Sequence, residues 1–165
     1  MIYEEIFRAF RKNKVRYAIV GGIAVNLLGS FRSTADLDIL VEMTDTNLSK
    51  VVKILTGLGY RVKQPVDPMG IADEKTRKDW IKNKHMTAFN FYKDDEFKEI
   101  DIIIDSPVRY EDAKADVRKI AAGDLSLPVV SEKHLIAMKK KAGRPVDRLD
   151  IKELQNLQRL RIRPK

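Results

Sequence analysis

The stretch VGGIAVNLLGSFRSTADLDILV, residues 20–41, decides the fold because it joins a glycine pair and two aspartates within one short span. The preceding residues, RYAIV, are apolar and rich in β-formers, and the residues after the glycines favour a helix. This pattern predicts a strand, a tight turn at Gly21 and Gly22, and a short helix. Glycines at such a turn let backbone N–H groups approach an anion such as a triphosphate, and a helix N-terminus adds positive partial charge.

Two carboxylates occupy the second half of the stretch, ADLDILVE, which predicts an interior strand. Asp36 and Asp38 flank Leu37. Side chains alternate between the faces of a strand, so both carboxylates project from one face, roughly 7 Å apart at the backbone. Neighbouring carboxylates repel each other unless a cation lies between them, and their oxygens suit Mg²⁺. We therefore predict a metal site here.

A third aspartate lies downstream in KEIDIIID, residues 98–105. Asp101 is at the centre of this apolar run, where an ionised side chain is costly to bury without partners. If the run pairs beside ADLDILV, Asp101 joins Asp36 and Asp38 in a three-carboxylate cluster able to hold two Mg²⁺ ions about 3.5–4 Å apart. Asp105 is the competing candidate, but its place at the end of the run favours a turn.

The order of these features resembles the nucleotidyltransferase superfamily, whose palm is shared with DNA polymerase β-like enzymes. Its pattern of an apolar residue, Gly, then Gly or Ser is matched by Val20-Gly21-Gly22. Its later Asp-apolar-Asp-apolar motif is matched by Asp36-Leu37-Asp38-Ile39, and its third aspartate by Asp101. GSFRSTADLDI and the late stretch LIAMKKKAGRPVDRLDIKEL also look like small bacterial and archaeal nucleotidyltransferases that include abortive-infection-type toxins.

The resemblance implies a minimal α/β nucleotidyltransferase fold, with a small mixed sheet flanked by helices and two C-terminal helices. It implies Mg²⁺-dependent transfer of a nucleoside monophosphate from a nucleoside triphosphate such as ATP to an acceptor hydroxyl, with release of pyrophosphate. RNA, a protein and a small molecule all stay open as the acceptor, and an antitoxin is an open partner. Many catalytic members carry Ser where this chain has Gly22. A catalytically weak or inactive nucleotide- or RNA-binding module therefore stays open as an alternative.

The resemblance also assigns roles to residues. It implies that Asp36 and Asp38 bind both metals and the triphosphate, and that Asp101 completes the metal site and helps to deprotonate the acceptor. Gly21 and Gly22 are implied to cradle phosphates.

Further contacts come from the loop before the carboxylates and from the late helices. Arg32, Ser33 and Thr34 either touch phosphates or brace the loop by hydrogen bonds. The resemblance implies a triphosphate contact for Lys139, although its run of three lysines is also typical of a solvated helix face. Near the turn between the last two helices we predict a structural ion-pair network of Arg144, Asp147 and Asp150.

Composition indicates one globular domain over residues 1–165, because the chain has 165 residues and 44% hydrophobic content. The absence of cysteine excludes disulfides and thiolate metal sites. No stretch approaches the roughly 20 apolar residues that a membrane span needs, so we expect a cytoplasmic protein.

The net charge of +8 is concentrated at the end of the chain. Residues 1–132 carry 21 basic and 21 acidic residues, whereas residues 133–165 carry 11 and 3, a difference of +8. The basic helical part, residues 131–165, either follows a polyanion such as RNA, neutralises the phosphates of a nucleotide, or is a solvated helix face with a frayed tail.

The remaining patterns predict packing elements. TAFNFYK and KEIDIIID are expected to form a hairpin with its turn at residues 94–96, and a short strand pair is expected around Gly123. The last helix is expected to turn Leu149, Leu154 and Leu157 inward. Helices are predicted over residues 1–14, 48–58, 73–83, 110–117, 131–142 and 146–160.

Overall fold

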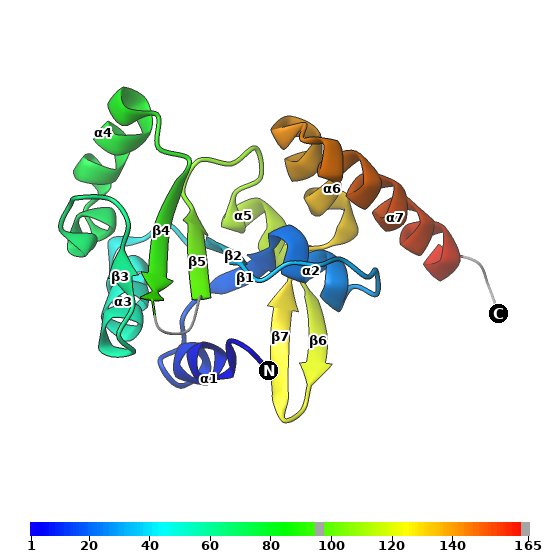
Figure 1. Ribbon diagram of the computed structural model, residues 1–165, viewed down its shortest axis with the longest axis horizontal. Helices are drawn as coiled ribbons and strands as arrows, with labels where there is room; N and C mark the ends of the chain where they lie inside the picture. Colours follow the sequence, from blue (N-terminus) through cyan, green and yellow to red (C-terminus); the bar gives the residue numbers. More distant parts are fainter. Residues whose placement is uncertain (95–97, 163–165) are drawn as a thin grey trace.

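The computed structural model describes residues 1–94 and 98–162 and confirms the predicted α/β fold with two C-terminal helices. Among these residues, seven strands form one mixed sheet in the order β3-β4-β5-β2-β1-β7-β6 (Figure 1). β2 pairs in parallel with β5, and β1 with β7, whereas the other neighbours are antiparallel. β2 is thus an interior strand, as its apolar sequence predicted.

The strands are short, and the predicted pairs are confirmed: β4 with β5 and β6 with β7 are antiparallel neighbours along the chain. The turn expected at residues 94–96 lies partly outside the described residues. The strands are β1 (Tyr17–Val20), β2 (Leu37–Val41), β3 (Arg61–Val62), β4 (Ala88–Lys93), β5 (Lys98–Ile103), β6 (Arg118–Ala122) and β7 (Leu125–Val129).

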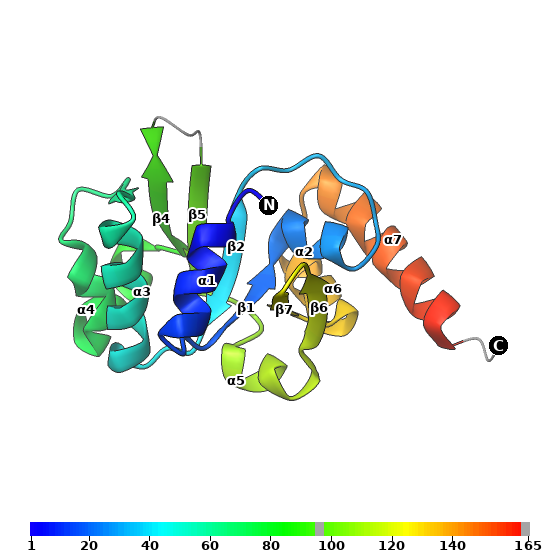
Figure 2. The same cartoon turned by 90° about the horizontal axis from the view of Figure 1, so that it is seen from below.

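α3 and α4 lie at one end of the molecule and α6 and α7 at the other, with α1, α2 and α5 between them (Figure 2). In the described part of the chain, no helix is long and apolar enough to cross a membrane. The helices are α1 (Glu4–Lys12), α2 (Gly21–Leu27), α3 (Asp45–Gly57), α4 (Glu74–Lys84), α5 (Tyr110–Ala113), α6 (Glu132–Ala142) and α7 (Pro145–Ile162), with 3₁₀ turns η1 (Pro68–Ala72) and η3 (Lys114–Asp116).

Alternation along β4 and β5 separates an apolar face of the sheet from a polar one. Phe89 and Phe91 are fully buried, and the ring of Phe89 stacks on Trp80 of α4 with ring centroids 5.4 Å apart. Asn90 and Asp101 alternate with this apolar layer and so project from the opposite face. The polar face therefore turns away from α4, toward the side on which the candidate site forms.

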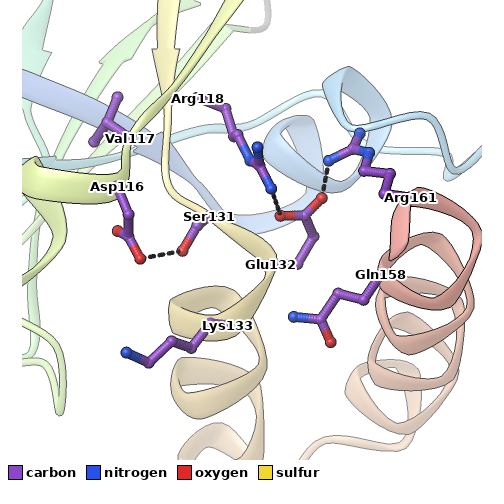
Figure 3. A pocket seen from close by; sticks show the side chains of 8 residues that line it. All are labelled: Asp116, Val117, Arg118, Ser131, Glu132, Lys133, Gln158 and Arg161. Carbon is purple, nitrogen blue, oxygen red and sulfur yellow. Dashed lines mark hydrogen bonds and ion pairs between the residues drawn. The ribbon is translucent and has the colours of Figure 1, made fainter. Parts of the chain in front are cut away.

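A buried carboxylate fastens the end of α7 to the rest of the fold (Figure 3). Glu132, at the start of α6, has a side chain only 2% exposed and pairs with Arg118 of β6 and Arg161 of α7. Arg161 also donates a 3.0 Å hydrogen bond to the backbone oxygen of Leu28. A cavity of about 440 Å³ lies beside this clamp. These contacts hold the basic C-terminal helix in place through internal ion pairs.

The inward face of α7 differs from the one predicted. Leu154 is fully buried and Leu157 is partly buried, but Leu149 is 67% exposed, so its prediction as a core residue was wrong. The inward face instead begins with two buried aspartates, Asp147 and Asp150, at helical spacing from Leu154. Their ion pairs, rather than the apolar residues alone, fix the rotation of the helix.

Candidate active site

The glycine turn brings backbone directly against a carboxylate. Gly21 follows β1 with a φ of +67°, a left-handed conformation that favours glycine. The neighbouring residue, Val20, is paired in register with Asp38 of β2. A Cβ atom on residue 21 would lie 1.8 Å from Oδ2 of Asp38, so any side chain there would collide with that carboxylate. The glycine therefore permits both the turn and the position of Asp38.

The second glycine is explained by a different neighbour. A Cβ atom on Gly22 would lie 2.9 Å from Oγ1 of Thr34 and 3.0 Å from its Cβ and Cγ2. Thr34 thus fills the space that a side chain at position 22 would need. Packing against this loop residue, which is twelve positions away in sequence, accounts for glycine here.

Asp38 and Asp101 are the centre of the site because they are register partners on the parallel strands β2 and β5. Burial, and then the charges of Asp101 and Asp36, raise the pKa of Asp38 to about 6. Burial and Asp36 likewise raise the pKa of Asp101, against a hydrogen bond from Asn90 that lowers it. The predicted pairing of these two strands is confirmed.

Asp36 lies just before β2 and is exposed, so it is not a strand residue as predicted. Its charge nevertheless acts on both Asp38 and Asp101. In the described part of the chain, no three His, Cys, Asp or Glu side chains already surround one point. These carboxylates still fit a divalent cation. Their oxygens are hard ligands, and a bound cation would relieve the repulsion between their negative charges. Asp38 and Asp101, with Asp36 beside them, would hold it.

The side-chain amides of Asn90 and Gln64 support Asp101, and the sequence analysis did not single them out. Asn90 of β4, the register partner of Asp101, donates a 2.6 Å hydrogen bond from Nδ2 to Oδ1 of Asp101. Gln64 in turn donates from Nε2 to Oδ1 of Asn90 at 2.5 Å and accepts from its backbone N–H at 3.2 Å. A polar residue between two phenylalanines in TAFNFYK was the available signal. The amide chain orients the Asp101 carboxylate and favours its ionised form.

The predicted ion-pair network is present and extends further than expected. Lys139 is 4% exposed and donates to Oδ2 of Asp150 at 2.6 Å, with Oδ1 of Asp147 at 3.5 Å. Arg144 binds Asp147, with Nε 2.9 Å from Oδ2, and Arg32 pairs with Asp150. Both Lys139 and Arg144 lower the pKa of Asp38 through their charges. Two carboxylates therefore hold the ammonium group of Lys139. Its predicted contact with a triphosphate stays a prediction.

The loop before the carboxylates is braced rather than open. The side-chain amide of Asn26 accepts from the backbone N–H of Arg32 and donates to its carbonyl, both at 2.7 Å. Ser33 is exposed, and Thr34 packs against Gly22. Hydrogen bonds to Asn26 therefore brace the loop at Arg32. Phosphate contacts of Arg32, Ser33 and Thr34 stay predictions.

A cleft of about 750 Å³ joins the glycine turn to the C-terminal helices. It brings together Gly21, Asp38, Asp101, Lys139 and Arg144 from the predicted set. Gly22, Asp36 and the loop residues 32–34 are not part of its wall. The rest of its lining comes from the end of β1, the start of β4, the end of β5 with the segment after it, and α6. These residues are Val20, Thr87, Ala88, Ile103, Asp105, Ser106, Pro107, Leu135, Met138, Lys141 and Ala142.

A glycine turn packed against one carboxylate, with a second carboxylate in register on the parallel neighbour, is the arrangement of a DNA polymerase β-like nucleotidyltransferase, and this protein is a nucleotidyltransferase of that superfamily. The family can be stated more narrowly. The sequence profile of the aminoglycoside-2''-adenylyltransferase family matches residues 3–154, so the chain belongs to that family.

Solved structures share this fold at low sequence identity. The lincosamide antibiotic adenylyltransferase LnuA, bound to lincomycin, is 20% identical with a TM-score of 0.61, over 92% of this chain and 93% of that one. ANT(2'')-Ia in complex with adenylyl-2''-tobramycin is 15% identical with a TM-score of 0.60, over 97% of this chain and 92% of that one. A comparison with curated protein sequences finds no match.

Proposed function

We propose that this nucleotidyltransferase transfers AMP from ATP to a hydroxyl group of a small-molecule acceptor, with Mg²⁺ and with release of pyrophosphate. The observation that carries the proposal is the register of Asp38 and Asp101, whose carboxylates line one cleft beside the glycine turn. The choice of AMP follows from the family to which the chain belongs, which is one of adenylyltransferases.

The chemistry needs a nucleophile, a leaving group and charge compensation. The acceptor oxygen forms a bond to the α-phosphorus, the bond from that phosphorus to the bridging oxygen of the β-phosphate breaks, and pyrophosphate leaves. Mg²⁺ held by Asp36, Asp38 and Asp101 would offset the negative charge that develops on the phosphates. Asp101, oriented by Asn90, takes the proton of the acceptor hydroxyl at a carboxylate oxygen.

Two further groups of the cleft act on the triphosphate. Gly21 lines the cleft beside Asp38 and has no side chain of its own, so its backbone would face the phosphates. Arg144 lines the same cleft, and its guanidinium is aimed by two hydrogen bonds to Asp147. A planar guanidinium so placed suits phosphate binding.

A small-molecule acceptor is favoured over RNA for two reasons. The two matched structures hold small molecules, lincomycin in one and adenylyl-2''-tobramycin in the other. In addition, part of the basic C-terminal charge is internally neutralised, since Lys139, Arg144 and Arg161 are ion-paired with carboxylates. RNA, protein acceptors and an antitoxin therefore become outcomes that an experiment can reveal.

The alternative of an inactive binding module loses its main support. Gly22, in place of a serine, motivated it, but Thr34 occupies the space of any side chain at that position. Glycine is thus dictated by packing and is no sign of lost activity.

The test is transfer of label from ATP marked at its α-phosphate. Wild-type protein is incubated with Mg²⁺ and a panel of lincomycin, tobramycin, neutral glycosides and total cell RNA. The same mixtures are run with Asp38→Ala and, as a matched control, with Asp79→Ala on the exposed face of α4. We expect label on a small molecule with wild type and Asp79→Ala, and none with Asp38→Ala or after chelation of Mg²⁺. Label on RNA alone contradicts the proposed acceptor, and no label or pyrophosphate with any acceptor contradicts the activity.

A further inference from the structure

Three carboxylates, Asp38, Asp101 and Asp105, line the cleft. Its three cations are Lys139, Lys141 and Arg144, on α6 and the turn after it, and Lys139 and Arg144 are already paired with carboxylates of α7. Sites that bind polyamines need an excess of uncompensated carboxylates, because each ammonium group must regain the solvation that it loses on binding.

Few of the cleft carboxylates stay available to a polyamine once the proposed reaction is assigned. Asp38 and Asp101 are then occupied by the divalent cation, so they are not free to bind ammonium groups. Asp105 is the remaining carboxylate of the cleft, and within residues 1–94 and 98–162 no ion pair occupies it. The site therefore offers an acceptor one acidic side chain, and Lys141 of α6 lines the same cleft.

The wall near Asp105 is otherwise apolar. Ile103 and Pro107 contribute from β5 and the segment after it, and Leu135 and Met138 from α6. Apolar side chains of this kind bind a ligand by removing its own apolar surface from water. A polyhydroxylated polyamine has little such surface to offer.

Long-range electrostatics act in the same direction. The chain carries a net charge of +8, which repels a polycation during diffusional encounter and leaves a neutral molecule unaffected. Glu99 on the polar sheet face is not an unpaired carboxylate for an ammonium group, since it is paired with Lys63 at 2.6 Å.

We infer that the acceptor is an amphipathic, hydroxyl-bearing small molecule with at most one positive charge, rather than a polycationic aminoglycoside, and that Ile103, Pro107, Leu135 and Met138 form the wall that binds its apolar part. This inference rests on the proposed function, because it deepens the identity of the acceptor at that site. It departs from the acceptor that the family description names.

The first experiment separates the two classes of acceptor by binding without turnover. Lincomycin, which has one basic amine, and tobramycin, a polyamine, are titrated into the full chain with Mg²⁺ and a non-hydrolysable ATP analogue. We expect lincomycin to bind at least tenfold more tightly. Tighter binding of tobramycin overturns the inference and leaves the proposed function intact. Because no chemistry is required, the inference is decided even when no AMP transfer occurs, and binding of neither compound also overturns it.

The second experiment uses kinetics and matched variants. We expect kcat/KM for the amphipathic acceptor to change little with added NaCl, whereas kcat/KM for a polyamine rises as salt screens the repulsion. Met138→Ser should raise KM for the acceptor and leave KM for ATP unchanged, and the exposed control Met69→Ser should change neither. A rise in KM for ATP alone with Met138→Ser places the nucleobase on this wall and contradicts the assignment.

Discussion

The backbone at Gly21 lies so close to Asp38 that a Cβ atom there would be 1.8 Å from the carboxylate oxygen Oδ2. The Asp38 carboxylate thus occupies the space of a side chain seventeen positions earlier in sequence. The pairing of Val20 with Asp38 on β1 and β2 fixes this short distance. The consequence is that the carboxylate proposed to bind the metal and the backbone proposed to face the phosphates are held together by one strand pair.

Gly21→Ala is expected to abolish activity, because the added methyl group displaces the Asp38 carboxylate. Gly123→Ala is the matched control, since Gly123 has a similar φ of +62° with nothing within 4 Å of its Cβ position. Both variants should lose about 1 kcal/mol of stability from backbone strain alone. Activity assays together with thermal unfolding check this, and equal activity of the two variants contradicts the proposed role of Gly21.

Gly22→Ser is expected to lower both stability and activity, because the serine side chain collides with Thr34. Removing the obstacle with Thr34→Gly should restore part of both losses. A double-mutant cycle should therefore give a coupling free energy of about 1 kcal/mol or more in favour of the double variant. Urea unfolding of the wild type, the two single variants and the double variant measures it, and additive effects refute the packing explanation.

Asn90→Ala is expected to reduce kcat by roughly 10- to 100-fold with KM for ATP nearly unchanged, because Asp101 loses the hydrogen bond that orients it. Gln64→Ala should have a smaller effect of the same kind, since it acts through Asn90. Asn83→Ala, which removes an exposed amide that contacts Asp79, is the control. An Asn90→Ala enzyme with wild-type kcat shows that the amide pair serves packing only.

Asp38→Asn is expected to stabilise the metal-free protein at neutral pH. The pKa of Asp38 is raised from 3.8 to about 6, so the folded state binds the proton more strongly than the unfolded state. Stability from this group is therefore present below about pH 4, falls as the pH rises from about 4 to 6, and stays low above that. Removing the charge should recover on the order of 2 kcal/mol at pH 7.

Unfolding free energies measured with chelator at pH 4 and pH 7 test this expectation for Asp38→Asn. The variant should gain at pH 7 and show little difference at pH 4. The control Asp79→Asn, on the exposed face of α4, should show neither change. A variant that is less stable than wild type at pH 7 contradicts the unfavourable burial of this carboxylate.

Glu132→Ala is expected to lower stability by about 1 kcal/mol, because it breaks the ion pairs with Arg118 and Arg161, whose side chains are 50% and 41% exposed and stay solvated. The end of α7 should loosen first, since this clamp fastens it. Hydrogen exchange of α7 amides checks the location of the effect. Glu111→Ala, which breaks an exposed pair with Lys114, is the control and should leave α7 protection unchanged.

The sequence by itself determined the elements whose signals are local. Glycines after a β-rich run predicted the turn at Gly21, alternation predicted the β4–β5 hairpin, and the order of glycines and aspartates predicted the superfamily. These features depend on neighbouring residues, whose sterics and spacing are written in a short window. The three aspartates of the candidate site, Asp36, Asp38 and Asp101, could therefore be singled out from the sequence pattern alone.

Only the tertiary structure decided which distant groups meet. The register that sets Asn90 against Asp101, the loop residue Thr34 that fills the space beside Gly22, and the burial of Lys139 between carboxylates of α7 all depend on contacts across the fold. Leu149 is a further example. It is apolar but exposed, because the ion pairs of α7 set which face of the helix turns inward. Sequence spacing carries no information on such contacts, because packing and charge compensation are settled only when separate elements assemble.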